Sequence, residues 1–458
     1  MSPAPGYMSR APRMPAHRER PLAMPLPKSV RLKNGLRLLH LPRHDLPLVH
    51  LSLVLRSGHA ADPAGEPGVA FATAALVDEG AGERTALDIS ADLQDLGTAL
   101  YISVDAETTT MTLDLLRDQL EPALAILADV LIRPHLAADE LERVKAEIVS
   151  RGEDRRSDPT QSASLALSSA VYGRHPYGRP VLPLPRSVGR LRRGQVVRFF
   201  RERYSPRNAL MMVAGDVILD RLEPLVQRTL GRWRRAGGAP RRARAPRPPS
   251  AGPRLIVVPR EGAAETVLRV GHLLPPRRAV DPVHVQLLNT VLGGSFTSRL
   301  NMNLRERHGF TYGAGSSMTL MCEHGMLSIS AQVAPEATVP ALRETLRELR
   351  GLSRRAVGSR ELAKARALLL EELPASAETL GGLSDAYLEL ALHREAMGSL
   401  NELPVRLLDA TPAVLHELAG QLLRPENATL VVVGEVAQSE LERAFGPAQI
   451  RDVDADLT

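Results

Sequence analysis

Several strands can be predicted from the spacing of apolar side chains along the chain. Residues 48–55 read Leu-Val-His-Leu-Ser-Leu-Val-Leu, a mostly apolar run that is typical of a strand. Residues 99–105 and 108–116 alternate between apolar and polar side chains on either side of Asp105-Ala-Glu107, which predicts a hairpin. A further strand is predicted for residues 326–333.

Helices are predicted where apolar residues recur on one face. Residues 120–132 are amphipathic and stop before Pro134, which cannot continue a helix. Another helix should end at His308, because Gly309 is a natural left-handed stop, and a strand should begin at Phe310. Further helices are expected at 140–151, 195–204, 283–292 and 340–352. Runs of strands followed by runs of helices indicate an α+β fold class.

The chain repeats itself at a nearly constant spacing. Asn208 and Asn427 lie in matching segments, Pro-Arg-Asn-Ala and Pro-Glu-Asn-Ala, which are 219 positions apart and precede similar apolar strands. A strand ending at Pro42 recurs 217 positions later, and the helix that begins Glu140-Leu-Glu-Arg recurs 221 positions later. Three such similar offsets predict two duplicated halves of about 200 residues each.

The expected organisation is therefore two halves joined by a linker. We expect a disordered tail (1–27), a first half (28–235), an exposed Pro/Arg-rich linker (236–253), a second half (254–446) and a C-terminal tail (447–458). The first tail lacks the apolar core of a secretory signal, and its seven prolines disfavour the helix of a mitochondrial transit peptide. This pattern favours a bacterial cytoplasmic protein.

The amino-acid composition excludes several classes of function. The chain has 458 residues, of which 44% are hydrophobic and only 3% aromatic, so aliphatic side chains must fill the core. No apolar run is long enough to predict a transmembrane helix. Cys322 is the only cysteine, which excludes a disulfide framework and a cysteine-based zinc site. The net charge is +6, but there is no aromatic platform or basic recognition helix, so no nucleic-acid partner is expected.

The segment around residues 68–76 resembles the insulinase/pitrilysin family of inverted zinc metallopeptidases. It reads Gly-Val-Ala-Phe-Ala-Thr-Ala-Ala-Leu, follows the strand at 48–55, and precedes Val77-Asp-Glu-Gly80. Family members carry His-x-x-Glu-His on this helix, where two imidazoles bind zinc and the carboxylate acts as general base. The two histidine positions match Phe71 and Ala75, and the glutamate position matches Ala74.

The third zinc ligand of the family is a glutamate on a later helix, and its position matches Arg151, which lies 76 residues after Ala75. An inward guanidinium at about 4 Å would repel a zinc dication by roughly 8 kcal/mol at an effective dielectric constant near 20. A shifted alignment could place Glu147 or Glu153 there, but one carboxylate without histidines does not make a zinc site. We therefore expect no catalytic residue, metal or cofactor in this chain.

One family segment is retained in the second half. The run Gly293-Gly-Ser-Phe-Thr-Ser-Arg-Leu-Asn-Met-Asn-Leu-Arg-Glu-Arg-His-Gly-Phe-Thr-Tyr312 resembles the segment that positions substrate. The resemblance implies that Arg305 and Tyr312 hold the peptide backbone and stabilise the oxyanion. The simpler alternative is an arginine that complements a helix dipole and a tyrosine that belongs to the core.

Other candidate residues have weaker patterns. Tyr177 lies in a segment that the family also carries near its cleft, although a role in a turn explains it equally well. His40, His44 and His50 could suggest a metal site, but Pro42 and Pro47 interrupt any helix between them. Cys322 precedes Glu323 and His324, which suggests a thiol enzyme, yet its apolar strand context favours an inert core thiol.

The resemblance implies two halves, each a mostly antiparallel sheet with helices packed on one face, that close like a clam shell around substrate. Three functions follow. The first, implied by the resemblance, is a non-catalytic, substrate-binding subunit of a heterodimeric zinc metallopeptidase that cleaves unstructured peptides, in which this chain pairs with a zinc-bearing subunit of the same family and binds an extended peptide. Alternatively, it is a structural or assembly subunit of a larger complex, or an active metallopeptidase with an unrecognised site.

Overall fold

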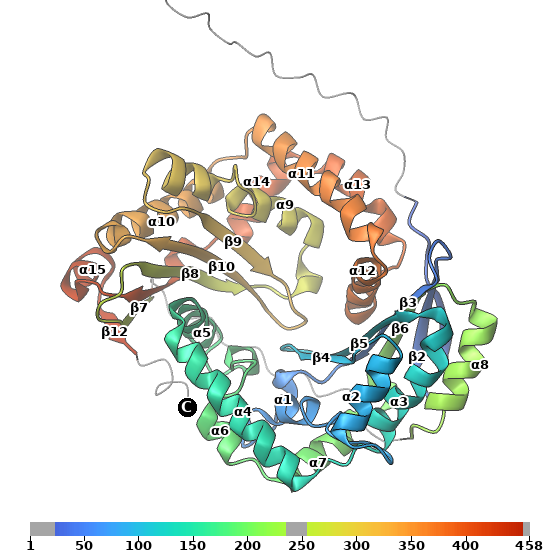
Figure 1. Ribbon diagram of the computed structural model, residues 1–458. Coiled ribbons are helices and arrows are strands. Elements are labelled where there is room, and N and C mark those ends of the chain that lie inside the picture. The colour runs from blue at the N-terminus through green and yellow to red at the C-terminus, as the bar shows by residue number, and fades with distance from the viewer. Residues whose placement is uncertain (1–22, 235–253, 452–458) are drawn as a thin grey trace, which may run out of the picture.

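The computed structural model describes residues 23–234 and 254–451, which form two halves that each contain a six-stranded mixed sheet (Figure 1). The first sheet has the order β1-β2-β6-β3-β5-β4, and only the β2–β6 pair is parallel. Its strands are β1 (Lys28–Arg31), β2 (Arg37–Pro42), β3 (Leu48–Leu55), β4 (Tyr101–Val104), β5 (Thr109–Leu116) and β6 (Ala209–Gly215).

The second sheet has the order β12-β7-β11-β8-β10-β9, in which β7 runs parallel to both β11 and β12. The remaining neighbours are antiparallel. Its strands are β7 (Arg254–Pro259), β8 (Thr266–Leu274), β9 (Ala314–Thr319), β10 (Gly325–Val333), β11 (Thr429–Gly434) and β12 (Ala448–Ile450). The α+β class that the sequence predicts is confirmed.

Helices surround both sheets (Figure 1). Those of the first half are α1 (Val69–Ala74), α2 (Ala86–Asp95), α3 (Leu120–Ile132), α4 (Ala138–Ser157), α5 (Pro159–Tyr172), α6 (Pro185–Gly189), α7 (Arg193–Arg203) and α8 (Leu219–Leu230). Those of the second half are α9 (Pro282–Leu292), α10 (Thr338–Arg354), α11 (Ser359–Glu378), α12 (Leu380–His393), α13 (Ser399–Asp409), α14 (Pro412–Leu422) and α15 (Gln438–Phe445).

Successive side chains of a strand point to opposite sides of the sheet. Because the central strands carry consecutive apolar residues, each sheet is apolar on both faces. In the first sheet, one face joins the core that includes α3, whereas Leu39, Leu41 and Met212 point the other way. That second face is covered by Leu383 and Tyr387 of α12, a helix that belongs to the second half. The first sheet therefore depends on a helix from the other half of the chain.

The second sheet shows the reciprocal arrangement. Ile256 and Val431 pack against Ala166 and Leu167 of α5, which belongs to the first half. The opposite face packs against helices of the second half itself, including α9, α10 and α14. The two halves thus exchange one helix each, and each sheet has its own helices on one face and the exchanged helix on the other.

Most predicted elements lie where the sequence places them, with two differences. The helix expected at 140–151 extends further at both ends, as α4. The strand expected to begin at Phe310 begins instead at Ala314, so this prediction is wrong. The preceding residues form a π-helix, Asn301–Arg307, and a turn with Gly309 at φ +64°, and the Asn301 side chain accepts a hydrogen bond from the Ala314 N–H at 2.9 Å. Strand pairing can begin only after this turn.

Parts of the expected tails belong to the fold. Met24 is buried, and its backbone N–H donates to Asn401 Oδ1 at 2.8 Å. Residues 448–450, placed in the C-terminal tail by the sequence, form β12 at the edge of the second sheet. The expected linker at 236–253, and the tails at 1–22 and 452–458, lie outside the described residues. None of the described helices combines the length and the apolar character needed to cross a membrane.

Candidate functional site

The segment that resembles the zinc helix is α1, and its start is held by a buried carboxylate. Asp62 accepts hydrogen bonds from the N–H groups of Gly68 at 2.6 Å and of Ala70 at 2.8 Å. Burial raises the pKa of Asp62 to about 7, although these two donors act in the opposite direction. Phe71 and Ala75 are four residues apart and share one side of the helix. The two histidine-equivalent positions therefore lie on the same side of the helix end.

The neighbour of the Phe71 side chain is Arg151 on α4. Its guanidinium carbon lies 5.8 Å from the centre of the Phe71 ring, within the range of a cation–π contact. Arg151 Nη1 also lies 3.7 Å from Glu147 Oε1, one turn earlier on the same helix. The structure thus brings two of the predicted positions, Phe71 and Arg151, into contact. Ala74 is 2% exposed and adds only a methyl group to the core.

These residues do not fit a zinc ion. Phe71, Ala74 and Ala75 offer no side-chain donor atom, and Arg151 contributes a fixed positive charge. Glu147, which a shifted alignment could have supplied, is 55% exposed and is paired with Arg151 and Arg143. Across residues 23–234 and 254–451, no group of three or more His, Cys, Asp or Glu side chains could hold a metal ion. The site lies where the family resemblance places a metal centre, but its side chains cannot bind a metal ion.

The π-helix in the second half places Arg305 at the surface. The guanidinium carbon of Arg305 lies 4.4 Å above the centre of the Phe296 ring, and its Nε lies 3.5 Å from Glu306 Oε1. The turn is anchored from behind, because Asn303 Nδ2 donates to Glu344 and Glu348 of α10. A short π-helix is a frequent feature of functional sites. Arg305 is therefore held in place while its side chain remains 36% exposed.

Tyr312 lies in the turn between the π-helix and β9, and 94% of it is exposed to solvent. The alternative of a tyrosine buried in the core is wrong. Within the described part of the chain, no hydrogen bond or ring contact joins Tyr312 to Arg305, or either of them to Phe71. The two predicted substrate-binding side chains are both accessible, but they do not touch one another.

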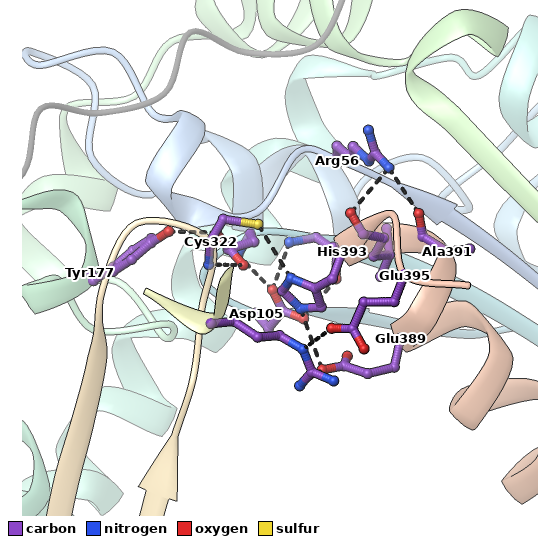
Figure 2. A network of polar contacts seen from close by, with 12 residues as sticks. Arg56, Asp105, Tyr177, Cys322, Glu389, Ala391, His393 and Glu395 are labelled. Atoms are coloured by element: carbon purple, nitrogen blue, oxygen red, sulfur yellow. Dashed lines mark hydrogen bonds and ion pairs between the residues drawn. The ribbon is translucent and has the colours of Figure 1, made fainter. Parts of the chain in front are cut away.

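A third cluster, which the sequence did not predict, lies where the two halves meet (Figure 2). Tyr177 donates its hydroxyl to Glu107 Oε1 at 2.5 Å, beside the turn between β4 and β5. The same carboxylate accepts the backbone N–H of Cys322 at 3.2 Å, from the turn between β9 and β10. Burial and the Glu107 charge both raise the pKa of Tyr177, which stays protonated as a donor. Tyr177 thus holds the junction of the halves and does not form an open peptide site.

Cys322 continues this cluster toward α12. Its Sγ lies 3.7 Å from His393 Nδ1, and His393 Nε2 lies 3.3 Å from Glu389 Oε1. Arg277 donates to Glu389 at 2.9 Å and to Glu395 at 2.6 Å (Figure 2). The cysteine is therefore a half-buried residue of a turn, and the expectation of a thiol in an apolar strand is wrong.

The chain of contacts from Cys322 to His393 and on to Glu389 resembles a catalytic nucleophile with its base and the carboxylate that orients the base. The surroundings oppose that chemistry. A catalytic thiol needs a positive environment that lowers its pKa, whereas the Glu107 carboxylate lies against the backbone of Cys322 itself. The cluster is better suited to joining three segments of chain than to attacking a substrate.

The three histidines in and between β2 and β3 have local partners. His40 Nε2 lies 2.8 Å from the Val217 carbonyl oxygen, and His44 Nδ1 lies 2.6 Å from Asp216. His50 contacts Asp114 and Ser52. Each imidazole is used in a separate hydrogen bond, so the three do not converge on one point.

Two family models match the chain. The model described as Insulinase (Peptidase family M16) matches residues 43–183, and the Peptidase M16 inactive domain matches residues 190–369. An uncharacterized zinc protease of Mycobacterium tuberculosis is 29% identical over 409 residues, which cover 87% of this chain and 92% of the relative. One from Bacillus subtilis is 24% identical, with 77% of this chain and 85% of the relative covered.

Solved structures share the fold. A peptidase M16 inactive domain from Pseudomonas fluorescens superposes with a TM-score of 0.83 at 23% identity, over 90% of this chain and 98% of that one. A protease from Helicobacter pylori gives 0.82 at 19% identity, over 89% and 99%. With the two-sheet architecture and the substituted zinc positions, these matches show that the chain belongs to the insulinase family of peptidases and lacks the zinc-binding motif of that family.

Proposed function

We propose that this protein is the non-catalytic, substrate-binding subunit of a heterodimeric zinc metallopeptidase that cleaves unstructured peptides. A second chain of the same family would supply His-x-x-Glu-His and the zinc ion. The observation that carries the proposal is the asymmetry between two sites. The zinc positions hold Phe71 packed under Arg151, while Arg305 and Tyr312 remain exposed in a turn anchored to α10.

The exposed pair has suitable chemistry for a peptide. A guanidinium presents several N–H donors in one plane, which suits carbonyl and carboxylate oxygens. The phenol of Tyr312 can donate one further hydrogen bond. Phe296, which is 67% exposed and stacks on Arg305, adds an apolar surface beside these donors. Together they can hold an extended backbone near a reaction centre on another chain.

A reconstitution experiment tests this role. The protein is mixed with a zinc-bearing family member from the same organism, and cleavage of an unstructured fluorogenic peptide is measured. We expect the double variant R305A/Y312F to cleave the peptide more slowly. Its activation free energy should rise by about 3–4 kcal/mol, which is the effect of losing an oxyanion donor.

The matched control is R307A/Y101F, which removes an exposed arginine from the same π-helix and an exposed tyrosine hydroxyl from β4. It should leave the rate unchanged. If R305A/Y312F cleaves as fast as the unmodified pair while the two chains still associate, the peptide-binding role is wrong. A purely structural or assembly subunit would give this result, an unchanged rate with the two chains still associated.

The proposal includes an origin for the two halves by internal duplication. Corresponding strands occupy corresponding places in the sheet orders β2-β6-β3-β5-β4 and β7-β11-β8-β10-β9. Each half also donates one helix to the other sheet. This correspondence, together with the sequence offsets near 219, supports a single ancestral unit that was copied once.

A further inference from the structure

Helices α10 and α15 lie at the outer edge of the second half (Figure 1), and α10 carries a row of arginines. Arg343, Arg347, Arg350 and Arg354 recur along α10 at intervals of four, three and four residues, which places them on one side of the helix. α10 and α15 both pack on the sheet face opposite to α5. This surface therefore lies on the side of the second sheet opposite to α5, away from the substituted zinc site of the first half, although the N-terminal part of α10 also anchors the turn that carries Arg305.

The arginine row borders two adjoining hollows. One, of about 720 Å³, lies between α10 and α15, with Leu346 and Phe445 among its lining residues. The other, of about 460 Å³, shares Arg350 and Arg354 with the first and extends to Leu423. We call the two hollows together the arginine groove. Its six guanidinium groups are those of Arg343, Arg347, Arg350, Arg354, Arg355 and Arg424.

Few of these charges are neutralised by carboxylates of the described residues. Arg347 pairs with Glu344 at 2.7 Å, and Arg424 lies 4.0 Å from Glu426. Within the residues that the structure describes, no carboxylate lies within 4.0 Å of the other four, Arg343, Arg350, Arg354 and Arg355. Like charges one turn apart weaken a helix, so this row does not serve the stability of α10.

We propose that the arginine groove binds an acidic segment of a partner polypeptide that carries apolar side chains between its carboxylates. Guanidinium groups form paired hydrogen bonds with carboxylates, and Arg clusters are a recurrent means of recognising acidic motifs. Ala444 and Phe445, which are partly exposed, provide an apolar floor that such a segment can cover. The row from Arg343 to Arg354 spans about 16 Å of helix, which matches a short peptide.

A nucleic acid fits this groove less well. Contacts to a phosphate backbone depend on positive charge and make no use of an apolar floor, and single strands are typically bound with aromatic side chains on which bases stack. Phe445 is the one aromatic side chain among the described residues that line the groove, and it is only partly exposed. A polypeptide with acidic and apolar side chains can contact both the guanidinium groups and the apolar floor, so it fits the groove better than a nucleic acid does.

Binding of a labelled synthetic peptide, followed by fluorescence anisotropy on the full-length chain, tests the proposal. The peptide alternates Asp or Glu with Leu and Phe. We expect the variant R350E/R354E to weaken its binding at least about tenfold, since two attractive contacts become repulsive. The control R190E/R201E changes the net charge equally at exposed arginines of the first half, and should shift binding less than about twofold. Added salt should weaken binding.

Three results would overturn the proposal. The first is equal binding by R350E/R354E, with circular dichroism confirming that the variant is folded. The second is equal or tighter binding of a charge-matched oligonucleotide, or of an acidic peptide without apolar residues. The third is binding that appears only after Asp452, Asp454 and Asp456 are changed to Asn, which would assign the groove to the chain's own acidic end.

Discussion

At the scale of single residues, the substituted zinc site lacks metal ligands, and in addition other side chains occupy the space. At the position that the resemblance assigns to one ligand, Phe71 places a ring, and Arg151 covers that ring at 5.8 Å. A dication at that distance from the guanidinium would be repelled by about 6 kcal/mol at an effective dielectric constant of 20. Solvent reaches 54% of the Arg151 side chain and reduces this value. The cation therefore opposes metal binding even if histidines were restored.

The site can be rebuilt to test this reasoning. The variant F71H/A74E/A75H/R151E should bind zinc, because it supplies two imidazoles and one carboxylate on adjacent helices. The triple variant that keeps Arg151 should bind at least about 100-fold more weakly, since it lacks one ligand and retains the opposing charge. Competition with a chromophoric chelator measures both affinities. Adding R201E to the triple variant is the matched control. Equal affinities of the triple and quadruple variants would show that Arg151 does not face the site.

At the scale of elements, the sequence predicts those that rest on local signals. The apolar periodicity of residues 120–132 and the following Pro134 predict α3 with its bounds as observed. The hairpin of β4 and β5 is also correct, because Asp105 Oδ1 accepts the N–H groups of Glu107 and Thr108 and so closes the turn locally.

Elements that depend on distant contacts were missed. The start of β9 is set by the Asn301 side chain and by pairing with β10, which no local pattern reveals. The contact between Cys322 and His393 spans 71 residues, and that between Cys322 and Glu107 spans 215. Cys322 lies next to polar residues in Met321-Cys-Glu-His324, which was the available signal that it belongs to a turn. The exchange of α5 and α12 has no signal in the sequence beyond strands that are apolar on both faces.

The turn between β9 and β10 should be held to the first half mainly through Glu107. We expect the variants E107A and Y177F to be coupled in a double-mutant cycle by about 1.5–3 kcal/mol, the range for a hydrogen bond to a charged group. Urea unfolding followed by circular dichroism measures each corner of the cycle. Y101F removes an exposed phenol from the adjacent strand β4, and should show no coupling to E107A. Additive effects of E107A and Y177F would mean that the 2.5 Å contact contributes nothing to stability.

At the scale of the whole molecule, neither half has a complete core of its own. The face of the first sheet that contains Leu39, Leu41 and Met212 is covered by α12. The face of the second sheet that contains Ile256 and Val431 is covered by α5. Fully burying one such side chain contributes about 1.5–3 kcal/mol, and a whole protein is stable by only about 5–15 kcal/mol. Several exposed apolar side chains on each sheet would therefore exceed the stability available to a separated half.

Separate production of residues 1–235 and 254–458 tests this interdependence. We expect each fragment alone to aggregate or to unfold without a cooperative transition, because one face of its sheet and one face of its exchanged helix would contact water. Co-expressed fragments should instead elute together in size-exclusion chromatography and unfold cooperatively, since α5 and α12 can still reach their sheets. Placing L388D in α12 should abolish this association, because Leu388 is buried in the shared core, whereas the exposed V414D in α14 should not. A fragment that remains a soluble, cooperatively folded monomer would show that the exchanged helices are dispensable, and that the halves behave as independent domains joined only by their linker.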